Sequence, residues 1–267
     1  MNGRSPALGQ YYPAKSPVHA LDPRVKLFLT ALVVIGIFFV HDMALLLAAA
    51  MLILVLASAA RLPYRWLAGG LRPLLFILVF TFFIHVFFTP GEVLFGLGPV
   101  TATFSGLRNG IFYSLRLTLV ILFSSFITGT TTPVQLTEAI ESIMSPLKRF
   151  RFPAHEIALM MTIALRFVPT LLAETETIIK AQKARGADFE SGHILRRARS
   201  FVPLLIPLFV SAFRRADELA LAMEARGYTG GEGRTRMRVL KVGTADIVWL
   251  AAGVVVVAAL VGASWVI

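Results

Sequence analysis

The sequence predicts an all-α polytopic membrane protein with about five transmembrane helices and long helices on the cytoplasmic side. Hydrophobic residues make up 57% of the 267 positions, and the mean hydropathy is +0.75, well above that of an average soluble domain. Several apolar runs are long enough to cross a bilayer as helices. The basic residues lie elsewhere, since seventeen of the 26 Lys and Arg fall between residues 129 and 242. These observations together predict a bundle of spans and a basic cytoplasmic region.

Charge and cysteine content exclude several classes of function. A net charge of +11 would suggest a nucleic-acid partner for a soluble protein, but in this chain we interpret it as the charge that retains loops in the cytoplasm. We therefore expect no nucleic-acid binding. The chain has no cysteine, which excludes disulfides, thiolate catalysis and cysteine-based metal sites. Residues 1–22 are too polar for a secretory signal peptide, so we expect the first apolar helix to act as an uncleaved insertion signal.

Residues 1–128 are predicted to form an N-terminal arm and the first four transmembrane helices. The first helix should begin at Asp22-Pro23, because Asp caps free amides and Pro suits the first helical position. A helix over residues 23–41 would be about 28 Å long, enough to span with little tilt. The four expected spans cover approximately residues 23–41, 43–60, 73–88 and 105–128.

The positions of the basic residues predict the topology. Arg61, Arg65 and Arg72 fall in what we expect to be a short loop between the second and third spans, which the positive-inside rule places in the cytoplasm. The connections at His41-Asp42 and at residues 89–104 contain no Lys or Arg, so both should lie outside. The N-terminus is therefore predicted to be cytoplasmic.

Residues 129–243 are predicted to form cytoplasmic or membrane-surface helices, and residues 244–267 a fifth span. The first helix should start at a capping box formed by Thr132 and Gln135 and end near Lys148. A second should run from about residue 154 to 185, apolar in its first half and charged in its second, with a kink at Pro169. A third should run from about residue 200 to 226. Its apolar segment, residues 201–213, is too short for a span. Together with residues 157–172 of the second helix, it is predicted to form a docking face that includes Leu205 and Phe209.

The same triplet closes the second and third of these helices: Ala184-Arg185-Gly186 and Ala225-Arg226-Gly227, with the arginines 41 positions apart. A glycine just past a helix end adopts the left-handed conformation that satisfies the last carbonyls. The arginine allows two interpretations. It either compensates the helix dipole as part of a plain cap, or offers its planar fork of donors to a partner.

Five further stretches stand out beside the two Ala-Arg-Gly triplets: residues 11–13, 21–24, 132–133, 145–147 and 164–170. Together with the triplets they resemble the T component, the transmembrane coupling protein, of energy-coupling factor (ECF) importers for vitamins and metals. The flanks of the triplets resemble the vitamin-importing branch whose coupling module is shared. One departure is Ala20, where relatives often have a basic residue.

The resemblance implies a multi-pass protein of the prokaryotic cell membrane that works with partners. Two ABC-type ATPase subunits would hydrolyse ATP, and a small membrane-embedded substrate-binding protein would capture the substrate. Ala184, Arg185 and Gly186 would dock on one ATPase, and Ala225, Arg226 and Gly227 on the other. The long helices would cross, and their apolar faces would contact the substrate-binding protein.

The chain itself is expected to be neither an enzyme nor a cofactor-binding protein. Its Gly-rich stretch, residues 230–233, lacks the lysine and the flanking strand of a phosphate-binding loop. The five histidines are scattered without the spacing of a metal site, so no metal is expected. Energy for transport would therefore come from another subunit.

Two other functions are considered from residues within the spans. A self-contained secondary transporter could use Arg116 in the fourth span, in line with Asn109 and Tyr113, although a structural bond to helix carbonyls is favoured. An intramembrane enzyme could use His85, but no third group is evident that would orient this residue as a base. Partners that co-purify with the protein would distinguish the coupling role from both.

Overall fold

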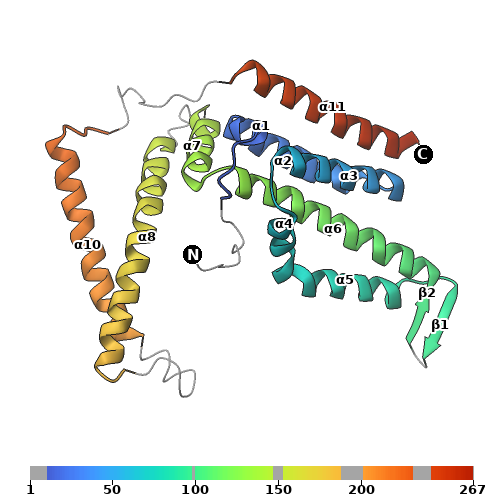
Figure 1. Ribbon diagram of the computed structural model, residues 1–267, viewed down its shortest axis with the longest axis horizontal. Coiled ribbons are helices and arrows are strands. Elements are labelled where there is room, and N and C mark those ends of the chain that lie inside the picture. The colour runs from blue at the N-terminus through green and yellow to red at the C-terminus, as the bar shows by residue number, and fades with distance from the viewer. Residues whose placement is uncertain (1–10, 98–99, 147–152, 188–200, 231–241, 267) are drawn as a thin grey trace. The chain divides into compact units, whose positions relative to one another are not determined.

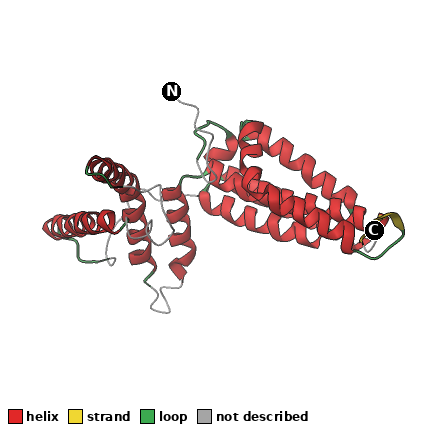
Figure 2. Ribbon diagram, turned by 90° about the horizontal axis from the view of Figure 1, so that it is seen from below, coloured by secondary structure: helices red, strands yellow, loops and turns green. Residues whose placement is uncertain are grey.

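A computed structural model of the chain describes residues 11–97, 100–146, 153–187, 201–230 and 242–266. Almost all of the described chain is α-helical, as Figures 1 and 2 show, which confirms the predicted all-α membrane fold. The chain divides into two compact units. The first contains residues 1–139 and 239–267, and the second contains residues 140–238.

The first unit is a helical bundle. Its longest helix, α6, packs against α2, α3, α4 and α5, and α11 packs mainly against α2 (Figure 1). The elements are α1 (Pro17–Ala20), α2 (Pro23–Phe39), α3 (Met43–Ala59), α4 (Tyr64–Leu71), the 3-10 helix η1 (Arg72–Leu74), α5 (Leu75–Phe88), β1 (Val93–Leu97), β2 (Val100–Thr103), α6 (Phe104–Thr130), the start of α7 (Pro133–Met144) and α11 (Thr244–Val266).

Local side-chain caps explain where several of these helices begin. The carboxylate of Asp22 accepts the backbone N–H of Arg24 at 2.8 Å, which satisfies a free amide at the start of α2. At α7, the N–H of Thr132 donates to Gln135 Oε1 at 3.0 Å, and the N–H of Gln135 donates to Thr132 Oγ1 at 3.3 Å. Both predicted caps are therefore confirmed.

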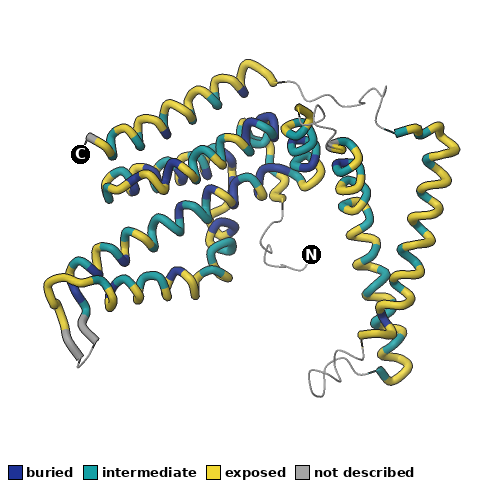
Figure 3. The backbone as a smooth tube through the Cα atoms, turned by 180° about the vertical axis from the view of Figure 1, so that it is seen from behind, coloured by how far each residue is buried: buried dark blue, intermediate teal, exposed yellow. Residues whose placement is uncertain are grey.

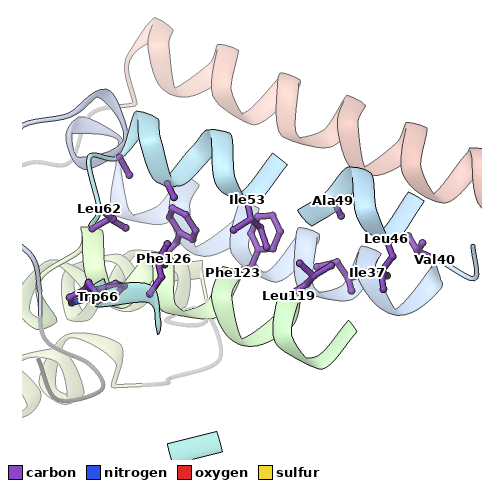
Figure 4. Close-up of a cluster of buried hydrophobic side chains, with 13 residues drawn as sticks. Ile37, Val40, Leu46, Ala49, Ile53, Leu62, Trp66, Leu119, Phe123 and Phe126 are labelled. Carbon is purple, nitrogen blue, oxygen red and sulfur yellow. The ribbon is translucent and has the colours of Figure 1, made fainter. Parts of the chain in front are cut away.

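The core of this unit is a stripe of apolar side chains from α2, α3, α4 and α6 (Figure 4). Leu46 and Val40 are fully buried, and Ile53 and Leu119 nearly so. The outward faces, drawn in yellow in Figure 3, are also apolar, and Phe76 on α5 is 77% exposed. An apolar surface on this scale is costly in water and favourable against lipid hydrocarbon, as expected for a bundle that spans a membrane.

Each of the five expected spans contains a helix. By length and composition, four helices of the described chain could cross a membrane: Tyr64–Phe88, Phe104–Thr130, His155–Ala184 and Thr244–Trp265. Helices α2 and α3 have 17 residues each, which corresponds to about 25 Å and is slightly short of a typical hydrocarbon core.

Two segments predicted to be loops have regular structure. The predicted short loop with Arg61, Arg65 and Arg72 is mostly the helix α4, because Trp66 and Leu67 become buried against the bundle. A Cβ added at Gly129 of α6 would lie 2.6 Å from the Trp66 ring, so only glycine leaves room for it. The connection over residues 89–104, which is predicted to lie outside, contains the antiparallel hairpin of β1 and β2 at one end of the bundle (Figure 2).

The second unit contains two long helices, α8 (Ala154–Ala184) and α10 (Val202–Ala225). They pack as an antiparallel pair (Figure 1), and Arg215 of α10 donates to Glu174 of α8 at 3.0 Å. Pro169 lies inside α8, as predicted. The predicted helix end near Lys148 lies outside the described residues.

Candidate functional site

The C-terminus of α8 forms a complete Schellman motif around the first triplet. Gly186 has a φ of +86°, the left-handed region in which a side chain is strained. Its N–H donates to the carbonyl of Lys183 at 3.0 Å, and the N–H of Ala187 donates to the carbonyl of Gln182 at 3.0 Å. These are the two bonds that define the motif.

The C-terminus of α10 repeats this geometry at the second triplet. Gly227 has a φ of +75°. Its N–H donates to the carbonyl of Glu224 at 2.8 Å, and the N–H of Tyr228 donates to the carbonyl of Met223 at 3.0 Å. The sequence repeat is thus a structural repeat, with each arginine at the C-cap position of its helix.

The two triplets are exposed, and their arginines are not needed to close the helices. All six residues are exposed, and nothing lies within 4 Å of a Cβ added at Gly186 or Gly227. Backbone amides make every capping bond. Within the described part of the chain, neither Arg185 nor Arg226 donates a side-chain hydrogen bond to another residue. Their donors are therefore available to a partner.

The antiparallel pairing places the two arginines toward opposite ends of the helix pair. Glu174 and Arg215, which bond to each other, are 41 positions apart, and the two arginines have the same separation. Each arginine therefore lies equally far along its helix from this ion pair. At 1.5 Å per residue the two arginines are separated by about 33 Å along the pair.

A groove adjoins the second triplet. Its volume is 430 Å³, and it is lined by the end of α10 and the first half of α8. Arg226 and Arg166 both line it, together with the aromatic side chains of Phe167 and Tyr228, and none of the described residues that line it is acidic. The groove is therefore electropositive. Arg166 lies within residues 164–170, one of the stretches that resemble the ECF family. The sequence alone did not indicate that it lines the same groove as Arg226.

The apolar face predicted on α10 is exposed in this structure. Leu205 is 47% exposed and Phe209 is 59% exposed, whereas Leu204 is 6% exposed. The face is continuous along the helix and lies on the side away from Leu204. Its other exposed residues are Phe201, Val202, Ile206, Val210 and Phe213.

Comparison with known proteins decides between the functions considered above. The model of the CbiQ family, described as "Cobalt transport protein", matches residues 14–237 of this sequence. The chain belongs to this family. The resemblance to the coupling component of ECF transporters is confirmed, since relatives that align with nearly the whole chain are named energy-coupling factor transporter transmembrane proteins.

Curated relatives align along nearly the whole chain. The energy-coupling factor transporter transmembrane protein EcfT of Thermosediminibacter oceani is 48% identical over 244 residues, which cover 91% of this chain and 92% of the relative. The EcfT proteins of Heliobacterium modesticaldum and Bacillus subtilis are 51% and 47% identical, and each alignment covers 87% of this chain and 88% of the relative. This family member is therefore similar to energy-coupling transmembrane subunits of ECF transporters.

The residues that supported the alternative functions have structural partners in this family member. The Arg116 guanidinium donates to the carbonyl of Val40 at the end of α2 and stacks over the Phe112 ring, 4.6 Å from its centroid. His85 Nδ1 donates to the backbone carbonyl of Thr81 at 2.8 Å, and its ring packs 4.5 Å from that of Tyr113. Both contacts favour the structural interpretation of these residues.

Proposed function

We propose that this chain transmits ATP-driven motion from two ABC-type ATPase subunits to a separate substrate-binding membrane protein that imports a vitamin or another micronutrient. One observation carries the proposal: two identical, exposed, arginine-bearing helix ends lie toward opposite ends of one antiparallel pair. This arrangement offers one arginine to each of two partners. The names of the EcfT relatives, as energy-coupling transmembrane proteins, support the same role.

The geometry of the caps favours a docking role for the arginines. Backbone amides alone make the capping bonds at each helix end. If the arginine served only the cap, its guanidinium would interact with nothing but the helix dipole. A docked arginine instead uses its planar fork for several directed bonds. The acid-free groove beside Arg226 suits a carboxylate on the partner.

The exposed face of α10 is the proposed contact for the substrate-binding protein. Leu205 and Phe209 lie in a continuous apolar surface that is open in the isolated chain. An apolar helix face of this kind stabilises a complex when another helix covers it. The charged arginine ends and this apolar face would then serve different partners.

A charge series at the two arginines tests the proposal. The complex is purified from its native membrane with Arg185→Lys, Arg185→Glu, Arg226→Lys or Arg226→Glu in this chain. Transport is measured with the compound that wild-type vesicles accumulate from a panel of radiolabelled vitamins and Co²⁺. Arg214→Glu is the matched control, because Arg214 is exposed on α10 outside both triplets.

The two interpretations predict losses of different size. A cation at a helix end contributes about 0.3 to 1 kcal/mol, so a pure cap predicts at most a fivefold effect and a nearly silent Lys variant. Removing one partner of a desolvated charged contact costs about 2 to 5 kcal/mol, so docking predicts a loss of ATPase binding of at least about thirtyfold for Glu and a smaller loss for Lys. We expect the double Glu variant to lose both ATPases. Near-normal transport by both single Glu variants would refute the docking role.

A further inference from the structure

Three helix ends meet at one buried cluster in the first unit. They are the N-terminus of α2, the N-terminus of α11 and the C-terminus of α6. The cluster consists of Asp22, Lys26 and Asp246, with exposed fractions of 6%, 6% and 7%. Charged side chains are rarely buried to this extent unless each one has bonding partners.

The Asp246 carboxylate joins the starts of two helices. Its Oδ1 accepts the backbone N–H of Asp22, the N-cap of α2, at 2.7 Å. Its Oδ2 accepts the N–H of Gly243, just before α11, at 2.8 Å. One carboxylate thus satisfies a free amide at each of two helix N-termini, where negative charge is also favoured by the helix dipoles.

Lys26 joins the same start of α2 to the end of α6. Its ammonium donates to the carbonyl of Thr130 at 3.0 Å and to the carbonyl of His19 at 3.1 Å. A cation is favourable at the C-terminus of α6 for the same electrostatic reason. The neighbouring carbonyl, that of Gly129, accepts the N–H of Tyr12 at 3.0 Å, so the N-terminal arm holds this helix end as well.

The cluster therefore holds the first unit close to both places where the chain passes to the second unit. The first unit ends within α7, after Ala139, and resumes at residue 239. The start of α7 and Gly243, both in the first unit, are described points close in sequence to these two crossings, and we call them the junctions. We propose that Asp22, Lys26 and Asp246 are positioning residues that fix these two junctions to α2, so that force applied to either junction acts on the bundle as one body. This inference rests on the proposed function for its role in coupling, but the fixed junctions can be tested without it.

The first measurement uses the purified chain alone. Spin labels are placed at Val134→Cys and Val242→Cys, exposed positions beside the two junctions in a chain without other cysteines. We expect a narrow distance distribution in the wild-type background. Lys26→Met, whose side chain suits the adjoining apolar cavity of 190 Å³, should broaden it, as should Asp246→Asn, whose amide cannot accept both backbone bonds.

The second measurement uses the complex from the native membrane and the radiolabelled compound that wild-type vesicles accumulate. The complex with Lys26→Met should retain both ATPases and ATP hydrolysis, but should transport about tenfold less compound per ATP. A tenfold loss is the change in the population of the fixed arrangement that is expected when a charge-assisted hydrogen bond is lost. The matched control is Arg24→Met, which removes a cation from the same turn of α2. Among the described residues, the Nε atom of Arg24 has no hydrogen-bond partner, and the bond to the end of α6 comes from Lys26. This control variant should behave like wild type in both measurements.

The outcomes separate the inference from the proposed function. Unchanged label distances in both variants, or wild-type transport per ATP, would overturn the inference. A wild-type complex that contains no ATPases would refute the proposed function, and the label distances would still decide whether the junctions are fixed. If Lys26→Met does not assemble, Asp246→Asn decides both measurements, because it preserves size and removes only the charge and one acceptor.

Discussion

Substituting the glycine of each triplet tests whether the two helix ends have the same left-handed geometry. Gly186 and Gly227 have φ angles of +86° and +75°, and open space surrounds the position of an added Cβ at each. Alanine would therefore meet no steric clash with neighbouring residues. Its only cost is the left-handed backbone, about 1 to 2 kcal/mol, which is a 5- to 30-fold shift in the local equilibrium.

The expected order at both positions is Gly, then Asn, then Ala, then Val, from most to least stable. Asparagine tolerates the left-handed region better than alanine, and β-branched valine is disfavoured there most strongly. Hydrogen exchange of the amides of residues 186, 187, 227 and 228 reports the opening of each helix end. We expect exchange at the substituted end to accelerate by about 5- to 30-fold in the alanine variants.

A second glycine provides the control. Gly262 lies within α11, also has nothing within 4 Å of an added Cβ, and does not have a positive φ. Gly262→Ala should therefore be neutral or slightly stabilising, because alanine has the higher helix propensity. The reasoning fails if alanine at Gly186 or Gly227 is as stable as glycine, or if valine is no worse than asparagine.

Three further predictions follow from the docking face, the topology and the N-terminal arm. Leu205→Glu or Phe209→Glu should release the substrate-binding protein while both ATPases stay bound, because a charge is costly in an apolar contact. Recovery of every partner with either variant would contradict this prediction. Asp217→Glu, at an exposed position on the same helix, is the control. Single cysteines at Phe95 and Arg65 should react with an impermeant thiol reagent from opposite sides, Phe95 from outside; labelling of both from one side would refute the topology. Burial lowers the pKa of His19 below its usual 6.5, so the fold favours the neutral ring, and this stabilisation is present above pH 6.5 and lost as the pH falls through the lowered pKa. Thermal unfolding of the wild type should therefore show a fall in stability below pH 6.5 that His19→Gln reduces, and an equal fall in both would contradict the assignment.

Local chemistry explains why much of the fold could be predicted from the sequence. The starts of α2 and α7 depend on side chains within three residues, Asp22 and the Thr132–Gln135 box, so their signals are complete in the sequence. The ends of α8 and α10 depend on Gly186 and Gly227 in the same way. The triplets could therefore be identified as helix ends, and their shared geometry follows from shared residues.

Long-range packing explains what could not be predicted. Its charges predict a loop for the segment with Arg61 and Arg65, but Trp66 stabilises a helix there by packing on Gly129, more than sixty positions away. The bond between Lys26 and Thr130 joins residues 104 positions apart. No sequence pattern at Trp66 or Lys26 indicates that its contact is Gly129 or Thr130. The groove shared by Arg166 and Arg226 likewise depends on the register of the helix pair.

The antiparallel register of α8 and α10 determines where the two triplets lie relative to each other. If α8 and α10 were parallel, the two arginines would lie together at one end and could serve a single site. In the antiparallel pair Glu174 and Arg215 bond to each other, and the common separation of 41 residues makes the two arms equal in length. Each arm extends about 16 Å from this ion pair to its arginine. A rotation about the ion pair would therefore displace both arginines by equal amounts in opposite directions. This symmetry suits the proposed function, in which two equivalent ATPase subunits each bind one arginine.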